Sequence, residues 1–244
     1  MLDTLTCASC GQENPAEAQF CNQCGARTET GAAKREERKL VSVLFVDLVG
    51  FTTRSDRADP EDVRDTLQLY YARAKERIER YGGSVEKFIG DAVMAVFGAE
   101  VSYGDDAERA VRAGLAVLEA IDELNAEHGL DLAARAAVNT GEAVVALGGQ
   151  VGEALAMGDV VNTASRLQTA APVGRLIVGA DTYRASRQAI RYEPMASIEA
   201  KGKDEPVPAW IAIEPSAAPA DRPIATNPLV GRSHEVELMR SVWE

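Results

Sequence analysis

Apolar residues recur along this chain with the periods of buried strands and amphipathic helices. Residues 40–47 (LVSVLFVD) are an apolar, β-branched run that ends on a carboxylate, which predicts a buried strand. Apolar positions three and four apart predict a helix over residues 61–81. The runs Val85–Ile89 and Ala92–Phe97 are separated only by Gly90-Asp91, which predicts a tight hairpin with a carboxylate at its tip.

The pattern continues with a second amphipathic helix, whose apolar positions run from Ala107 to Leu124. Asn139-Thr140-Gly141 has the composition of a turn. A helix is predicted over Asp159–Ala170, with Asp159 placed as an N-cap rather than as a metal ligand. The other expected elements are strands at Leu132–Val138, Ala143–Leu147, Arg175–Val178, Ile190–Glu193 and Val207–Ile213, and a short helix near Thr182–Arg187. The opening order βαββαβ predicts an α+β, ferredoxin-like fold.

All four cysteines lie near the N-terminus, as Cys7-x-x-Cys10 and Cys21-x-x-Cys24. Two such pairs can close a tetrahedral Zn²⁺ site, and the metal would supply the folding energy of a segment too small to bury a core. A disulfide pair is disfavoured in a reducing compartment, and a thioredoxin-type redox motif lacks its βαβ surroundings. The segment resembles the zinc ribbons that head many bacterial regulatory proteins. Four thiolates leave no open position, so a structural or docking role is expected.

Changes in composition divide the chain into five segments. Residues 1–26 are the expected zinc ribbon, 27–39 a polar linker, 40–213 the main domain, 214–228 a Pro- and Ala-rich linker, and 229–244 the start of a further domain. The phrase PLVGRSHEVELM resembles the opening of large P-loop ATPase modules. We therefore expect the chain to be the front part of a longer protein, in which such a module could regulate the main domain.

Charge and composition narrow the class of partner. The chain has 26 Lys and Arg against 38 Asp and Glu, a net charge of −12, which argues against nucleic acid because an acidic chain repels phosphate backbones. No apolar run approaches the roughly 20 residues that cross a bilayer, and no secretion signal opens the chain, so a cytoplasmic protein without membrane contact is expected. His128 and His234 are the only histidines, which argues against a histidine-based triad.

Two aspartates are the candidate chemistry-bearing residues of the main domain. Asp47 ends the first strand and Asp91 occupies the hairpin tip, so a ferredoxin-like sheet would bring both carboxylates to one edge. Each alone is an ordinary turn residue, whereas together they could bridge two hard cations. The segment after Asp47, from Leu48 through Gly50 to Phe51 and Thr52, supplies backbone N–H groups that could approach phosphate.

Four motifs, FVDLVGFT, VEKFIGDAVMAVFG, VNTGEAV and GDVVNTASRL, resemble the class III nucleotidyl cyclase catalytic domain over about residues 40–213. The resemblance implies the conversion of ATP to 3′,5′-cyclic AMP and pyrophosphate, an adenylate cyclase activity in signal transduction. It also implies a symmetric homodimer whose active sites lie at the interface. The residue roles that it implies are Asp47, Asp91 and the backbone of Leu48 for two Mg²⁺ or Mn²⁺, Lys87 for adenine, Asn162 and Arg166 for the ribose and the pentavalent phosphorus, and Lys203, or else Lys201, for the terminal phosphates.

One position departs from the family pattern. Leu155 stands where the family commonly carries a polar residue that reads the exocyclic group of the base, so base selectivity would rest on Lys87 and backbone groups. Three alternatives remain open. The first is a decayed cyclase-like module that binds nucleotide without turnover. The second is a diguanylate cyclase or a polymerase-palm-like nucleotidyltransferase, although the hairpin tip carries one acid rather than two. The third is a zinc-ribbon interaction protein whose main domain is a scaffold.

Overall fold

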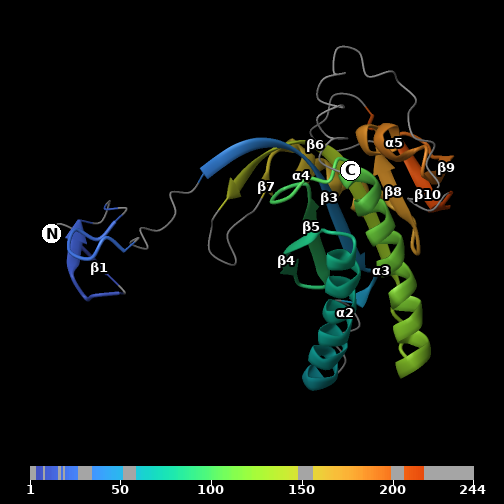
Figure 1. The fold of residues 1–244 in the computed structure, drawn as a ribbon. Helices are drawn as coiled ribbons and strands as arrows, with labels where there is room; N and C mark the ends of the chain where they lie inside the picture. The colour runs from blue at the N-terminus through green and yellow to red at the C-terminus, as the bar shows by residue number, and fades with distance from the viewer. Residues whose placement is uncertain are drawn as a thin grey trace, which may run out of the picture.

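The computed structural model contains a small cysteine-bearing unit and a large mixed α/β unit (Figure 1). It describes residues 4–7, 9–15, 18, 20–26, 35–51, 59–147, 156–198 and 206–216. The small unit holds strands β1 (Thr4–Thr6) and β2 (Glu13–Pro15), which pair antiparallel. The expected segments 214–228 and 229–244 lie almost entirely outside the described residues.

The large unit is built on one mixed sheet. Its strands are β3 (Arg35–Leu48), β4 (Ser84–Ile89), β5 (Ala92–Phe97), β6 (Ala134–Leu147), β7 (Ala156–Met157), β8 (Leu176–Gly179), β9 (Ile190–Pro194) and β10 (Ala209–Pro215), and its helices are α2 (Pro60–Arg80), α3 (Asp106–His128), α4 (Asp159–Ala170) and α5 (Ala180–Ser186). The described strands lie in the order β4-β5-β3-β6-β8-β10-β9, with β7 beside β6. The opening order β3-α2-β4-β5-α3-β6, with β3 antiparallel to both β5 and β6, confirms the predicted ferredoxin-like arrangement.

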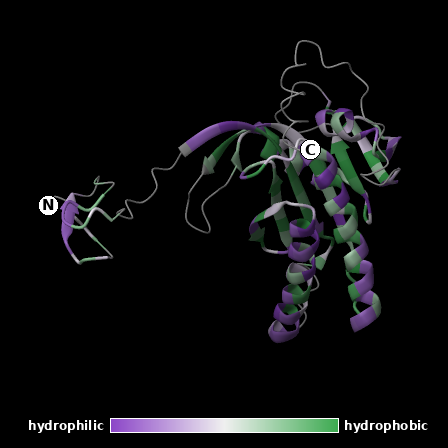
Figure 2. Ribbon diagram, in the orientation of Figure 1, coloured by the Kyte–Doolittle hydropathy of each residue, from purple (hydrophilic) through white to green (hydrophobic). Residues whose placement is uncertain are grey.

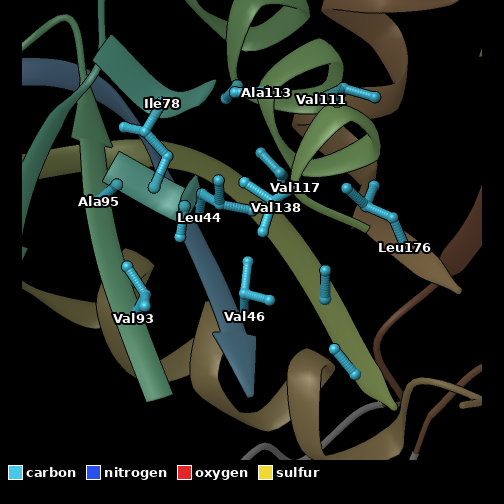
Figure 3. Packing of buried hydrophobic residues seen from close by; sticks show 14 of the residues in the cluster. Leu44, Val46, Ile78, Val93, Ala95, Val111, Ala113, Val117, Val138 and Leu176 are labelled. Atoms are coloured by element: carbon cyan, nitrogen blue, oxygen red, sulfur yellow. The ribbon is translucent and has the colours of Figure 1, made fainter. Parts of the chain in front are cut away.

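Both faces of the sheet are buried around the middle of β3, which explains why residues 41–46 (VSVLFV) are apolar at every position except Ser42. Leu44 and Val46 point to the face that α2 and α3 cover (Figure 3), whereas Val43 and Phe45 share the opposite face with residues of α4. Figure 2 shows the strands behind α2 and α3 as largely hydrophobic, whereas the first part of β3 is hydrophilic, and α2 and α3 are hydrophilic along much of their length. Among the described residues, no helix is long and apolar enough to cross a membrane.

The predicted helix faces and the hairpin are confirmed. Tyr70, Ala74 and Ile78 of α2 are buried, as their spacing predicted. The hairpin β4–β5 turns at Gly90-Asp91, where Gly90 has a φ of +61°, a value that glycine adopts without strain.

Two boundary predictions are wrong. Asn139-Thr140-Gly141 is not a turn, because β6 runs unbroken from Ala134 to Leu147 and pairs with β3 along its length. The hydroxyl of Thr140 is hydrogen-bonded inside the sheet, to the hydroxyl of Ser42 at 2.8 Å and to that of Thr182 at 2.9 Å. Gly141 has no side chain, which leaves room for Val160 of α4. β3 also begins at Arg35, so the last five residues of the expected linker over 27–39 belong to a strand.

Candidate functional site

The four cysteine side chains converge in the small unit. Their Sγ atoms all lie within 4.8 Å of one another, with 3.7 Å between Cys7 and Cys24 and 3.6 Å between Cys10 and Cys21. A tetrahedral site with Zn–S bonds of about 2.3 Å has sulfur atoms about 3.8 Å apart, so the geometry fits a Cys₄ zinc site. The cysteines are free thiols rather than disulfides, as the sequence predicted.

The two C-x-x-C turns have the same backbone pattern. Cys7 N–H donates to Gln12 O at 2.8 Å, and Cys21 N–H donates to Ala26 O at 2.7 Å. Hydrogen bonds from the backbone N–H groups of Cys24 and Gln23 lower the pKa of the Cys21 thiol to about 6. A thiol with a lowered pKa is readily available as the thiolate that a metal requires.

Strand register brings Asp47 and Asp91 to one edge of the sheet. Asp47 of β3 pairs with Ala92 of β5, and Ala92 directly follows Asp91 at the hairpin tip. The two carboxylates also act together on a third group, because burial, then the charges of Asp47 and Asp91, raise the pKa of Tyr70 well above its ordinary value. Carboxylate oxygens are the donors that Mg²⁺ and Mn²⁺ prefer, so this pair fits hard divalent cations.

Asp47 is held in place by β6 and by the last turn of α4. Its Oδ2 accepts hydrogen bonds from Gln168 Nε2 at 3.0 Å and from Arg135 Nη2 at 3.3 Å. The same guanidinium donates to Thr169 O at 2.9 Å, which ties it to α4 as well. Gln168 is buried, whereas the Arg135 side chain is partly exposed and could meet an anionic ligand.

Helix α4 carries the predicted pair Asn162 and Arg166 one turn apart. Asn162 is exposed and Arg166 is half-buried. A helix turns by about 100° per residue, so Arg166 points about 200° around α4 from Gln168, the residue that contacts Asp47. Asp47 and Arg166 of one chain therefore lie on different sides of this helix.

Asp159 is the first residue of α4 rather than its N-cap, which is Gly158. Its carboxylate accepts a hydrogen bond from Thr163 Oγ1 at 3.3 Å. The N-cap prediction is therefore wrong by one position, although an acid in the first turn still suits the helix dipole.

Lys87 lies on β4, on the same face of the sheet as Asp47. It pairs with Met94, whose partner on β3 is Phe45, two positions before Asp47. Its side chain is 46% exposed. The lysine can therefore reach a molecule that approaches this face.

The segment after Asp47 leaves the sheet at once. Leu48 is the last residue of β3 and is buried, and Phe51 is buried three residues later. Thr52, Leu155 and Lys203, with the alternative Lys201, lie outside the described residues.

Sequence reasoning missed three residues that the fold brings to this region: Arg135, Gln168 and Glu86, the last of which contacts Lys87. Arg135 had a signal, since it is a lone cation inside an apolar strand. Gln168 had none, because its contact with Asp47, 121 residues away in the chain, depends on how α4 packs on the sheet. Glu86 was hidden by an irregularity of β4.

Comparison with known proteins agrees with this geometry. Residues 33–212 match the adenylate and guanylate cyclase catalytic domain, and residues 6–28 match a zinc-ribbon domain. Adenylate cyclase 1 of Rhizobium meliloti (strain 1021) is 33% identical over 183 residues, which are 70% of this chain and 27% of that protein. The uncharacterized protein R02095 of the same organism is 28% identical over 90% of this chain and 22% of its own length. This chain thus spans about a quarter of the length of these two curated relatives.

Solved structures resemble the large unit. The adenylyl cyclase CyaB from P. aeruginosa is 30% identical with a TM-score of 0.69, over 74% of this chain and 96% of that one. The guanylyl cyclase Cya2 is 29% identical with a TM-score of 0.70, over 78% of this chain and 99% of that one. The similar structures therefore include both an adenylyl cyclase and a guanylyl cyclase. From the fold, the paired carboxylates and the match over residues 33–212, we conclude that this chain belongs to the class III nucleotidyl cyclases and carries a zinc ribbon ahead of its catalytic domain.

Proposed function

We propose that this chain is an adenylate cyclase, which converts ATP into 3′,5′-cyclic AMP and pyrophosphate at the interface of a homodimer. The observation that carries the proposal is the register of β3 and β5, which sets Asp47 beside the residue that follows Asp91. Lys87 supports ATP as the substrate, because an ammonium group donates to a ring-nitrogen acceptor such as adenine N1, whereas guanine carries an N–H at that position.

The chain's own groups would bind and orient the nucleotide. Arg166 would donate to the α-phosphate as charge develops there, and Asn162 would orient a ribose oxygen. Arg135, beside Asp47, would neutralise part of the polyphosphate charge. The backbone N–H groups of Phe51 and Thr52 and the side chain of Lys203, or else Lys201, would serve the remaining phosphate oxygens.

The aspartate pair would hold the divalent metal ions. Asp47, Asp91 and the backbone carbonyl of Leu48 would bind two Mg²⁺ or Mn²⁺, which supply charge neutralisation and a lower pKa for the attacking 3′-hydroxyl when bound. Arg135 and Gln168 would keep Asp47 oriented before the metal arrives. The zinc ribbon, with four thiolate ligands, would hold a structural Zn²⁺ apart from this chemistry.

The direction of Arg166 favours a site shared by two chains. Gln168 faces Asp47 of its own chain, so Arg166, about 200° around the same helix, faces away from that carboxylate. A second copy could bring its Arg166 to this Asp47 and receive the reciprocal contact, which gives two identical sites under twofold symmetry.

Product formation tests the proposal. The purified chain is incubated with ATP or GTP and Mn²⁺, and cyclic nucleotide is quantified by chromatography. Asp91→Ala removes one of the paired carboxylates, and Asp122→Ala, on the exposed side of α3, is the matched control. Cyclic AMP that is lost only in Asp91→Ala supports the proposal. A dimeric sample that binds ATP and forms no cyclic product would replace it with the nucleotide-binding regulatory module.

A further inference from the structure

Glu86 is a buried acid that the proposed mechanism does not use. Its side chain is 2% exposed, and within the part of the chain that the structure describes neither carboxylate oxygen has a hydrogen-bond partner. Its Oε1 lies 3.4 Å from Nζ of Lys87, close enough to pair the charges but not aligned as a hydrogen bond. A buried carboxylate is costly for folding unless its charge is paired, so the ammonium group of Lys87 is the partner through which Glu86 can act.

A β-bulge brings these two charges together. Val85 pairs with Ala95 and Lys87 pairs with Met94, so Glu86 is an extra residue of β4 with no partner of its own on β5. Neighbouring side chains of a regular strand point to opposite faces of the sheet, which would separate an acid from the lysine that follows it. The bulge re-aims the side chains and lets the carboxylate of Glu86 reach the ammonium group of Lys87.

The two side chains differ in exposure in a way that assigns their roles. Lys87 is 46% exposed, so it is the group presented to a ligand, whereas Glu86 lies behind it. A lysine side chain has many rotamers, and a ligand that fixes them must offset the lost entropy. The ion pair with Glu86 limits the rotamers of Lys87 before a ligand binds. An exposed acid at this point would instead accept hydrogen bonds from the N–H groups of guanine.

We infer that Glu86 is a positioning residue that holds Lys87 ready to read the purine base and thereby favours ATP over GTP. The inference rests on the proposed function, in which Lys87 contacts adenine. By the family resemblance, Leu155 stands where relatives carry a polar side chain that reads the base, and a leucine side chain cannot donate or accept a hydrogen bond, so selectivity would depend more heavily on the placement of Lys87.

The test is Glu86→Gln, which keeps the shape of the side chain and removes its charge. Steady-state kinetics with ATP and with GTP, and calorimetric binding of each nucleotide, are measured beside the melting temperature. Glu79→Gln is the matched control, because Glu79 forms an ion pair with Lys75 at 3.7 Å on the exposed side of α2. We expect Glu86→Gln to raise KM for ATP and to lower the ATP-to-GTP ratio of kcat/KM about tenfold. The melting temperature of Glu86→Gln should not fall. Glu79→Gln should change neither KM for ATP nor the ATP-to-GTP ratio of kcat/KM.

Two further variants make the test specific. Glu86→Asp keeps the charge and should restore part of the selectivity. In a Lys87→Gln background, Glu86→Gln should have no additional effect, because Glu86 acts through the lysine. Equal losses for ATP and GTP with a lower melting temperature would show a structural role and overturn the inference, as would an unchanged ratio. If the wild-type chain forms no cyclic product, the proposed function fails, whereas a binding preference for ATP that disappears in Glu86→Gln still supports the role of Glu86.

Discussion

The hydroxyl of Tyr70 offers a sharp test of the packing near the paired carboxylates. Tyr70 is fully buried on α2, and its Oη has no hydrogen-bond partner within the described residues. Burial and the charges of Asp47 and Asp91 raise the pKa of Tyr70, so the hydroxyl remains protonated at neutral pH. Tyr70→Phe removes this unsatisfied polar group and leaves the ring in the core.

The expected change in the free energy of unfolding follows from the burial of the Tyr70 hydroxyl. A buried polar group without a partner costs about 1–3 kcal/mol, and the small void left by the oxygen offsets part of the gain. We therefore expect Tyr70→Phe to raise the free energy of unfolding by about 1 kcal/mol. For a domain of this size, that corresponds to a rise in melting temperature of about 2–4 °C.

Scanning calorimetry measures the shift, and a second tyrosine supplies a comparison of opposite sign. Tyr192 Oη contacts Ser186 Oγ at 2.6 Å, so Tyr192→Phe loses a hydrogen bond and should lower the free energy of unfolding by about 1 kcal/mol. A lower melting temperature for Tyr70→Phe would show instead that the hydroxyl has a stabilising partner.

Three other predictions concern the zinc ribbon, the stability at alkaline pH and the hydrogen bond from Gln168 to Asp47. A chelator should release about one Zn²⁺ per chain and unfold the ribbon, detected by a zinc dye and circular dichroism, with the cyclase domain melting as before; a ribbon that stays folded without metal would contradict this. Burial raises the pKa of Tyr192 to about 12, so its contribution to stability is complete below pH 10 and is lost as the pH rises through about 12, which urea unfolding at several alkaline pH values can follow. Gln168→Leu should cost about 1.5 kcal/mol through its lost hydrogen bond to Asp47, and urea unfolding should show a smaller cost in an Asp47→Ala background.

Local patterns were enough to predict most elements of the catalytic domain. The helix over Asp159–Ala170 has the predicted ends, because its apolar positions recur with the helical period and Gly158 and Pro172 bound it. The hairpin around Gly90-Asp91 was equally clear, since two apolar runs flank a two-residue turn. Elements that depend on distant partners were harder. Asn139-Thr140-Gly141 has turn composition, yet Ser42, Thr182 and the close packing of α4 hold it inside a strand.

The residues of the candidate site also divide into those that local patterns predict and those whose role depends on distant contacts. The neighbouring positions of Asp47 and Asp91 were predicted because one follows an apolar strand run, the other lies at a hairpin tip, and the fold class sets the two side by side. Gln168 could not be predicted, since its contact with Asp47 depends on how α4 lies across the sheet. Glu86 could not be predicted either, because a regular strand would turn it away from Lys87 and the bulge leaves no recognisable mark in the residues SVEKFI.

In the proposed homodimer, one active site takes Asp47 from one chain and Arg166 from its partner. Asp47→Ala and Arg166→Ala are each expected to abolish cyclic AMP formation in homodimers. The two variants are then co-expressed with different tags, and the mixed dimer is isolated by two affinity steps. One of its two sites keeps both residues, so we expect about half of the wild-type activity per dimer. A mixed dimer as inactive as its parents would contradict the shared site.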